Sequence, residues 1–323
     1  MEVIESLPSA DSVGAGCALT IGNFDGVHLG HQRIITEARR AAGLAGANDL
    51  AVMTFEPHPA TILHPQKAPQ ILTPLVLKKD ILQKLGVDLL IVLKDSFDLL
   101  NLSPADFVDD FLMKHIGPKV IIEGPNFNFG YGRSGNARTL KALGAAHGFE
   151  VIIVPAREIE IGNSRFICSS SGVRSFLEEG TVANAKAALG RCYRLMGHTV
   201  SGRGIGRQLG FATVNIEPID QIVPAEGVYA GFVGTGEDLA DVCAPGRLRH
   251  AAVSIGRAKT FVSTHPLLVE AHILEEEVED LSDKWLTIDF VDRIRTQQRF
   301  ESKEKLAAQI AKDCEAARQI LAE

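Results

Sequence analysis

The first half of the chain alternates short apolar runs with amphipathic segments of helical period. The apolar runs predict buried strands over 17–21, 50–55, 88–93, 120–122 and 151–154. The segments between them predict helices over 31–44, 74–85, 104–115 and 137–147. Strands that are apolar on both faces and separated by helices form parallel sheets. We therefore expect an α/β, Rossmann-like doubly wound parallel sheet, with ligands beyond the carboxyl ends of its strands.

From Tyr193 onward the pattern changes to β-like runs separated by turn residues. These runs cover 193–200, 211–216, 227–233, 250–255, 268–273 and 286–291, and the next helical pattern is 302–321. Closely spaced strands of this kind predict a small antiparallel β-barrel with a C-terminal helix packed on it. We place the domain boundary in the short helix 181–189, which gives domains 1–185 and 186–323.

Composition narrows the class of protein. A chain of 323 residues with 46% hydrophobic residues can form two cores, and its net charge of −7 argues against a protein that coats nucleic acid or an anionic membrane. Five scattered cysteines without a C-x-x-C pair predict thiols in a reducing compartment. No basic-then-apolar leader or membrane-length apolar run is visible. We expect a cytoplasmic protein with small-molecule partners. Whether it forms a homo-oligomer is left open by the sequence.

The turn Gly22–Gly26 joins the first buried strand to the first long helix, near whose start lie His28, Gly30 and His31. Glycine allows a tight turn, and free N–H groups at a helix N-terminus attract anions. Two histidines three residues apart share one helical face and can donate hydrogen bonds to phosphate oxygens. The spacing matches neither a Walker loop nor a G-x-G-x-x-G turn. It favours a nucleotide phosphate site over the alternative of a surface or capping histidine beside an ordinary glycine turn.

The stretch GNFDGVHLGHQ resembles the G-x-F-D-G-x-H-x-G-H signature of the HxGH nucleotidyltransferases. It is most similar to the variant of the bacterial bifunctional riboflavin kinase/FAD synthetase family. The resemblance implies that His28 and His31 are catalytic. It also implies that ATP is bound by Gly22, Asn23, Phe24 and Asp25.

The segment EGPNFNFGYGRSGN (123–136) follows another predicted strand. Rigid aromatics and side-chain amides suit a planar heterocycle, although a loop that packs Phe127 and Phe129 into the core remains an alternative. The segment resembles the family's G-x-D/N-F-x-F-G-x-x-R-x-G loop, with Asn126 and Asn136 where many relatives have aspartate. The resemblance implies a flavin site built from Asn126, Phe127, Phe129 and Arg133.

The run CSSSGVR (168–174) places three serines ahead of a helix and an arginine one turn into it. Such serines form either a simple N-cap or, together with the guanidinium, a second phosphate cradle. The run is similar to the family's S-S-T/S-x-I/V-R motif. The resemblance implies triphosphate binding by Ser170, Ser171 and Arg174.

The barrel carries its own glycine loop, GHTVSGRGIGRQLGFATVN (197–215), whose glycines and arginines suit a phosphate ligand. It resembles the riboflavin kinase motif G-x-x-x-x-G-R-x-L-G-F-P-T-A-N. The resemblance implies ATP binding by Gly202, Gly206, Arg207, Thr213 and Asn215, with Mg²⁺ held by Thr213 and Asn215. It also implies that Glu270, in LLVEAHIL, is the catalytic base for the riboflavin hydroxyl, and that Arg295 lies beside the flavin.

The chain departs from the family pattern at Ala212, Val214, Ser254, Lys259, Ser282 and Asp283. The resemblance implies a bifunctional enzyme that uses ATP and Mg²⁺ to phosphorylate riboflavin to FMN and then adenylylates FMN to FAD with release of pyrophosphate. One alternative is a monofunctional FMN adenylyltransferase with a degraded kinase barrel. A more distant alternative is a flavin-binding regulator without catalysis.

Overall fold

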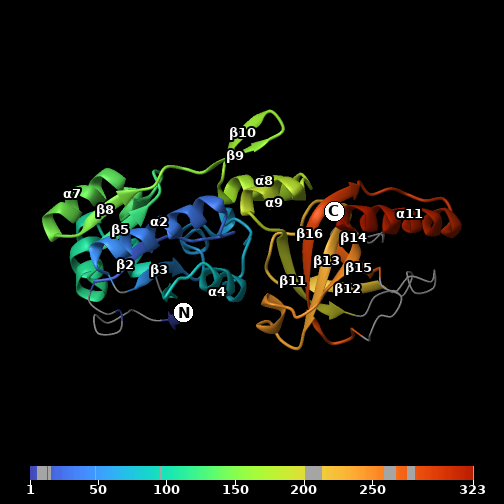
Figure 1. Ribbon diagram of the computed structural model, residues 1–323, viewed down its shortest axis with the longest axis horizontal. Helices are drawn as coiled ribbons and strands as arrows, with labels where there is room; N and C mark the ends of the chain where they lie inside the picture. The colour runs from blue at the N-terminus through green and yellow to red at the C-terminus, as the bar shows by residue number, and fades with distance from the viewer. Residues whose placement is uncertain are drawn as a thin grey trace. The chain divides into compact units, whose positions relative to one another are not determined.

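The computed structural model describes residues 1–5, 13, 16–47, 49–94, 97–200, 213–257, 267–274 and 281–322. They form two compact units (Figure 1). The first contains Met1–Pro69, Lys78–Glu158 and Arg165–Cys168, and the second contains Gln70–Leu77, Ile159–Ser164 and Ser169–Glu323. Because Gln70–Leu77 belongs to the second unit, the division does not follow a single cut in the chain.

The first unit is built on a six-stranded parallel sheet in the order β1-β4-β3-β2-β5-β8. Its strands are β1 (Glu2–Ile4), β2 (Ala18–Ile21), β3 (Leu50–Phe55), β4 (Leu89–Leu93), β5 (Val120–Glu123) and β8 (Glu150–Ile153). The predicted doubly wound sheet is confirmed, and β1 is an edge strand that the apolar pattern did not reveal. From β2 the chain winds through β3 to β4 on one side of the sheet and then crosses to β5 on the other side of β2. The carboxyl ends of the neighbouring strands β2 and β5 are therefore the switch point where such sheets bind ligands.

The predicted helices of this unit are present. They are α2 (Leu29–Ala45), α4 (Leu75–Lys84), whose first three residues belong to the second unit, and α7 (Ala137–His147). The short helices α3 (Pro59–Leu63) and α5 (Phe97–Leu100) were not predicted. The predicted helix 104–115 is a short α6 (Pro104–Asp106) followed by a π-helix, η2 (Phe107–Ile116). The buried faces of η2 and the strands form one core, which contains Phe107, Phe111, Ile91 and Ile121.

The predicted antiparallel barrel is confirmed in the second unit. The barrel is closed, with its strands in the order β11-β12-β15-β14-β13-β16. Its strands are β11 (Tyr193–Val200), β12 (Thr213–Pro218), β13 (Gly227–Gly236), β14 (Leu248–Arg257), β15 (Leu267–Ile273) and β16 (Trp285–Arg295). The C-terminal helix α11 (Lys303–Ala322) packs on the barrel through Cys314, Ala317 and Leu321 (Figure 1). Helices α8 (Ser170–Glu178) and α9 (Val182–Leu189) contribute to the barrel's own core.

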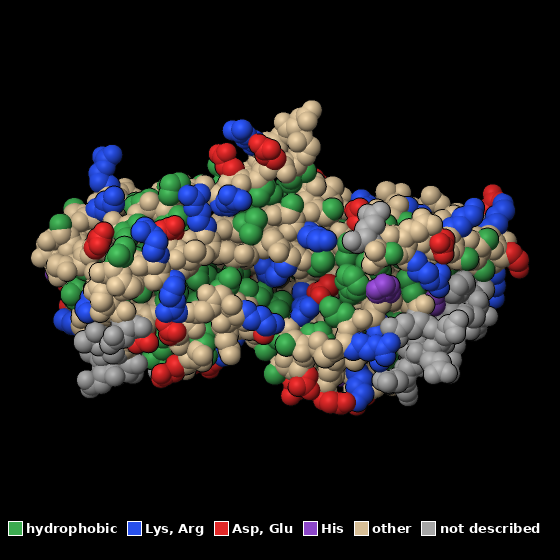
Figure 2. Space-filling view, in the orientation of Figure 1, with side chains coloured by type: hydrophobic (Ala, Val, Ile, Leu, Met, Phe, Trp, Pro, Cys, Tyr) green, Lys and Arg blue, Asp and Glu red, His purple; other side chains and the backbone are tan. Residues whose placement is uncertain are grey.

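Two short hairpins escaped the sequence pattern because their strands are only two or four residues long. They are β6 (Asn128–Phe129) with β7 (Gly135–Asn136), and β9 (Glu158–Ile161) with β10 (Ser164–Ile167). All five cysteines are free thiols, as expected. Acidic and basic side chains are interspersed over the visible face of both units (Figure 2). No helix in the described part of the chain has the length and apolarity needed to cross a membrane.

Candidate active sites

The turn after β2 has a strained backbone. Phe24 and Val27 have φ angles of 46° and 40°, a region that glycine adopts far more readily, and a β-branched residue there is an outlier. Their side chains are almost completely buried, at 2% and 0% exposure, and this packing holds the backbone in place. Strain of this kind gathers at ligand sites, which agrees with the phosphate turn predicted from the sequence.

His28 and His31 lie together, as their spacing predicted, with ring centroids 3.7 Å apart and the rings stacked. His28 is the N-cap of α2, and its Nδ1 accepts from the backbone N–H groups of Gly30 at 3.1 Å and His31 at 3.3 Å. These two amides are therefore not free for an anion, contrary to our expectation. Because Nδ1 accepts, the neutral His28 ring carries its hydrogen on Nε2, where it can be donated to a phosphate oxygen.

The second histidine is buried in an environment that disfavours charge. Burial lowers the pKa of His31 well below its ordinary 6.5, and the nearby His28 and Lys78 lower it further. Its Nδ1 is buried without a hydrogen-bond partner among the described residues. At neutral pH, His31 is therefore an uncharged imidazole with unused hydrogen-bonding capacity.

Glycine is required between the two histidines. A Cβ atom at Gly30 would lie 2.9 Å from His28 ring atoms and 3.2 Å from the carbonyl oxygen of Cys168. Both distances are shorter than ordinary van der Waals contact, so a side chain there would displace the stacked ring.

Two residues near this turn were not singled out from the sequence. Lys78, in α4, is 5% exposed and donates from Nζ to the carbonyl oxygen of Asn23 at 2.9 Å. Glu123, at the end of β5, accepts from the Ile21 N–H at 2.6 Å, which ties the ends of β2 and β5 together. Burial raises the pKa of Glu123 well above its ordinary 4.5. No local pattern marks either residue, because a lysine in a helix and a glutamate ending a strand are ordinarily exposed.

The predicted flavin loop is divided between core and surface. Phe129 is buried in the core of the first unit, and Phe127 is partly buried and stacks on it at 5.5 Å. Asn126 and Arg133 are exposed. Asn136 is the N-cap of α7, where a neutral amide replaces aspartate without loss of the cap. The packing therefore agrees with the core alternative for Phe129, and a flavin role for the four predicted residues stays a prediction.

The serine run begins α8, within the second unit. Ser169 caps the helix by accepting from Gly172 N–H at 3.1 Å, and its hydroxyl lies 3.2 Å from that of Ser171. Ser170 is the first helical residue. Arg174 donates from Nε to the carbonyl oxygen of Gln70 at 2.8 Å, and this hydrogen bond fixes the orientation of the guanidinium group.

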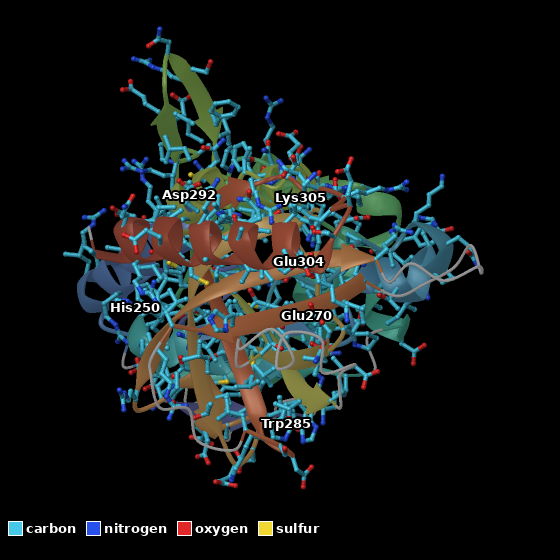
Figure 3. All side chains as sticks on the ribbon, turned by 90° about the vertical axis from the view of Figure 1, so that its right-hand side faces the viewer. His250, Glu270, Trp285, Asp292, Glu304 and Lys305 are labelled. Carbon is cyan, nitrogen blue, oxygen red and sulfur yellow. The ribbon has the colours of Figure 1, made fainter. Side chains whose placement is uncertain are left out.

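The barrel carries a pocket of about 620 Å³ between its strands and the first turns of α11. Thr213, Glu270 and Arg295, three of the predicted kinase residues, line it. Asn215 pairs directly with Glu270 across β12 and β15, and opposite residues in an antiparallel pair share one face. Figure 3 shows Glu270 on the barrel beside α11, whose first turn carries Glu304 and Lys305. Gly202, Gly206 and Arg207 lie outside the described residues.

Arg295 is fixed by an ion pair at the edge of this pocket. Its Nε and Nη2 donate to the two carboxylate oxygens of Asp313 at 2.8 and 2.7 Å. Gln309 also donates to Asp313, at 2.9 Å, and the guanidinium lies 5.8 Å from the Phe300 ring centroid. Asp313 and Gln309 belong to α11, so the C-terminal helix orients Arg295, which the family resemblance predicts to lie beside the flavin.

The departures from the family pattern that can be described are accommodated locally. Val214 packs against the barrel core, so its extra volume lies on the face opposite Thr213 and Asn215. Ser254 lines the pocket and accepts from Gln297 Nε2 at 3.0 Å. Asp283 takes a φ of 56° in an exposed turn, and Ser282 precedes it. Ala212 and Lys259 lie outside the described residues.

Comparisons with known proteins match both halves of the chain. A family model described as FAD synthetase matches residues 11–170, and one described as riboflavin kinase matches residues 189–321. The bifunctional riboflavin kinase/FMN adenylyltransferase of Escherichia coli (strain K12) is 35% identical over 299 residues, which cover 92% of this chain and 90% of that protein. The protein of the same name from Pseudomonas fluorescens is 34% identical, covering 100% and 98%. A crystal structure described as a macrolide-efflux protein from Streptococcus pneumoniae is 27% identical with a TM-score of 0.83, covering 98% and 99%.

Proposed function

Because the chain belongs to the bifunctional riboflavin kinase/FMN adenylyltransferase family, we propose that it carries out both reactions. One phosphorylates riboflavin to FMN with ATP, and the other transfers AMP from ATP to FMN, giving FAD and pyrophosphate. One observation carries the proposal: each matched half contains its own polar cluster, the stacked histidines in one and the Glu270 pocket in the other. The riboflavin kinase match and the core packing of Val214 favour this function over a degraded kinase barrel.

In the adenylyltransferase half, His28 and His31 act at the reacting phosphates. An oxygen of the FMN phosphate attacks the α-phosphorus of ATP, the bond to the β-phosphate oxygen breaks, and pyrophosphate leaves without a covalent enzyme intermediate. The Nε2 hydrogen of His28 is donated to a phosphate oxygen whose charge grows in the transition state. The Gly22–Asp25 turn binds ATP, and Ser170, Ser171 and Arg174 are further phosphate ligands.

In the kinase half, the Glu270 carboxylate accepts the riboflavin hydroxyl proton as the γ-phosphoryl group is transferred. The Thr213 hydroxyl and the Asn215 amide oxygen share one face of β12, and Asn215 lies across from Glu270. This set of hard oxygen donors fits Mg²⁺, which supplies countercharge to the phosphates when bound. Arg295, held by Asp313, lies beside the flavin.

The remaining expectations complete the proposal. We place the functional boundary at 185/186, between the end of the FAD synthetase match and the start of the riboflavin kinase match. The enzyme acts in the cytoplasm on riboflavin, FMN and ATP as small-molecule partners, with Mg²⁺ as the metal.

A two-way separation of activities tests the proposal. Wild-type protein with riboflavin and Mg-ATP is expected to form FMN and then FAD by mass spectrometry. Glu270→Gln should lower FMN formation by about a hundredfold and leave FAD formation from supplied FMN intact. His28→Ala and His31→Ala should do the reverse, with a loss of about a hundredfold or more. Glu304→Gln, an exposed carboxylate in α11, is the matched control.

Each result has one meaning. A wild type that makes FAD from FMN but no FMN from riboflavin supports the monofunctional alternative. A wild-type protein that binds flavin but forms neither FMN nor FAD supports the alternative of a flavin-binding regulator without catalysis. Wild-type rates in Glu270→Gln refute the assignment of the base.

A further inference from the structure

Lys78 occupies an unusual position for a lysine. It lies in α4 beneath the turn that follows β2, and only 5% of it is exposed. Its ammonium donates to the Asn23 carbonyl oxygen at 2.9 Å and lies 3.5 Å from the Thr54 hydroxyl. Burying an ammonium is costly, and burial lowers the pKa of Lys78. The next residue, Lys79, shows the ordinary arrangement, since it reaches the surface and pairs with Glu5 at 2.6 Å.

Carboxylates compensate part of that cost. Asp25, in the turn after β2, and Glu56, just after β3, both raise the pKa of Lys78 against the effect of burial. The ammonium is thus held between the carboxyl ends of two neighbouring strands, at the edge of the sheet where ligands bind.

The same ammonium acts electrostatically on the histidine pair. The pKa of His31 is lowered first by burial, then by His28 and then by Lys78. Lys78 is therefore close enough for its charge to favour the neutral imidazole of His31. Among the described residues, the titratable and charged groups around this point are His28, His31, His58, Lys78, Asp25 and Glu56, with His58 Nε2 2.8 Å from the side-chain amide nitrogen of Asn23.

We propose that Lys78 is a positioning residue for FMN adenylylation: its ammonium holds the Asn23 carbonyl oxygen, and with it the phosphate turn, and presents a fixed positive charge to the His28–His31 pair. This inference rests on the function proposed above. The packing of Phe24 and Val27 holds the strained part of this turn, and the Lys78 ammonium adds a hydrogen bond at Asn23, the residue next to it. Dipoles that are already oriented stabilise a growing phosphate charge without reorganisation, so loss of the anchor lowers the rate of the chemical step more than substrate binding.

The test compares Lys78→Met with Lys79→Met, the same change one residue further along α4. We expect kcat for FAD formation from FMN to fall about tenfold or more in Lys78→Met, with a smaller change in KM for FMN. NMR of the histidine ring protons should show the His31 titration midpoint at higher pH in Lys78→Met, because a positive charge is removed. Lys78→Arg keeps the charge and should keep the low midpoint, and Lys79→Met should match wild type in both measurements.

A second measurement does not depend on the variant folding. In wild-type protein with ¹⁵N-labelled lysine, the Lys78 ammonium signal should shift when ATP is added, whereas the Lys79 signal should stay. An unshifted Lys78 signal, or a Lys78→Met variant with the kcat and the His31 midpoint of Lys79→Met, overturns the proposal. A wild type that makes no FAD instead overturns the function, so the two failures are distinguishable.

Discussion

The ion pair between Arg295 and Asp313 gives a quantitative prediction for Asp313→Asn. The substitution keeps the shape of the side chain and one acceptor oxygen, but it removes the charge and one of two hydrogen bonds to the guanidinium. The side chains of Arg295 and Asp313 are 15% and 5% exposed, so little solvent replaces what is lost. Arg295 is left with a buried positive charge at the edge of the pocket.

The expected magnitude follows from burial. Removal of one partner from a buried ion pair costs about 3–5 kcal/mol. Since asparagine retains one bond and Arg295 retains some exposure, we expect a loss of about 2–3 kcal/mol in the free energy of unfolding. For a unit of this size that corresponds to a melting temperature lower by about 4–12 °C. Because Arg295 lines the pocket, KM for riboflavin should also rise, by about tenfold.

The assay follows thermal unfolding, and the relevant transition is the one whose melting temperature rises when riboflavin and Mg-ATP are added, since a ligand stabilises the unit that binds it. Glu315→Gln is the matched control: it lies on the same helix, its side chain is 62% exposed, and its partner Arg318 is 3.6 Å away. FAD formation from supplied FMN should not change in either variant. If Asp313→Asn had the melting temperature and riboflavin KM of Glu315→Gln, the role given to this ion pair would be refuted.

Two further predictions concern the first unit. Gly30→Ala should lower FAD formation by about tenfold or more, because the added Cβ displaces the His28 ring. Gly43→Ala is the control in the same helix, since a Cβ there meets no atom within 4 Å, and it should leave FAD formation unchanged. Equal activities of the two variants would contradict the packing argument. Glu123→Gln should flatten the dependence of stability on pH. The pKa of Glu123 is raised in the folded protein, so above about pH 4.5 the unfolded chain loses the proton first and wild type loses stability as pH rises. Unfolding measured by denaturant at several pH values checks this, and parallel curves for the two proteins would contradict it.

The sequence predicted those features that depend on local pattern. Buried strands, the glycine turn and the histidine pair are visible because apolar runs and i,i+3 spacing translate directly into backbone geometry. The π-helix Phe107–Ile116 is not visible, because one extra residue per hydrogen-bonded turn leaves the apolar pattern nearly unchanged. Free amides were expected at the start of α2, but the side chain of His28 satisfies two of them.

Lys78 and Asp313 could not be identified for a different reason. In LVLKKDILQK (75–84), two lysines stand side by side, and which of them is buried depends on distant strands. Asp313 lies in a charged helix, and its partner is 18 residues away. Long-range contacts of this kind carry no signature in the local sequence.

The second unit's core has a consequence for dividing the enzyme into fragments. Leu72, Val173 and Leu177 pack in one cluster with barrel residues, and Ile222 donates its N–H to the Ile71 carbonyl oxygen at 2.9 Å. A fragment that starts at residue 186 omits these side chains, and one that starts at 169 still omits Gln70–Leu77. Both fragments would expose apolar surface that the full chain buries, which favours aggregation. The unit that contains the barrel is assembled from segments that are interleaved in the chain with those of the first unit. A recombinant barrel that is to remain monomeric therefore needs Gln70–Leu77, either added as a separate peptide or fused to it.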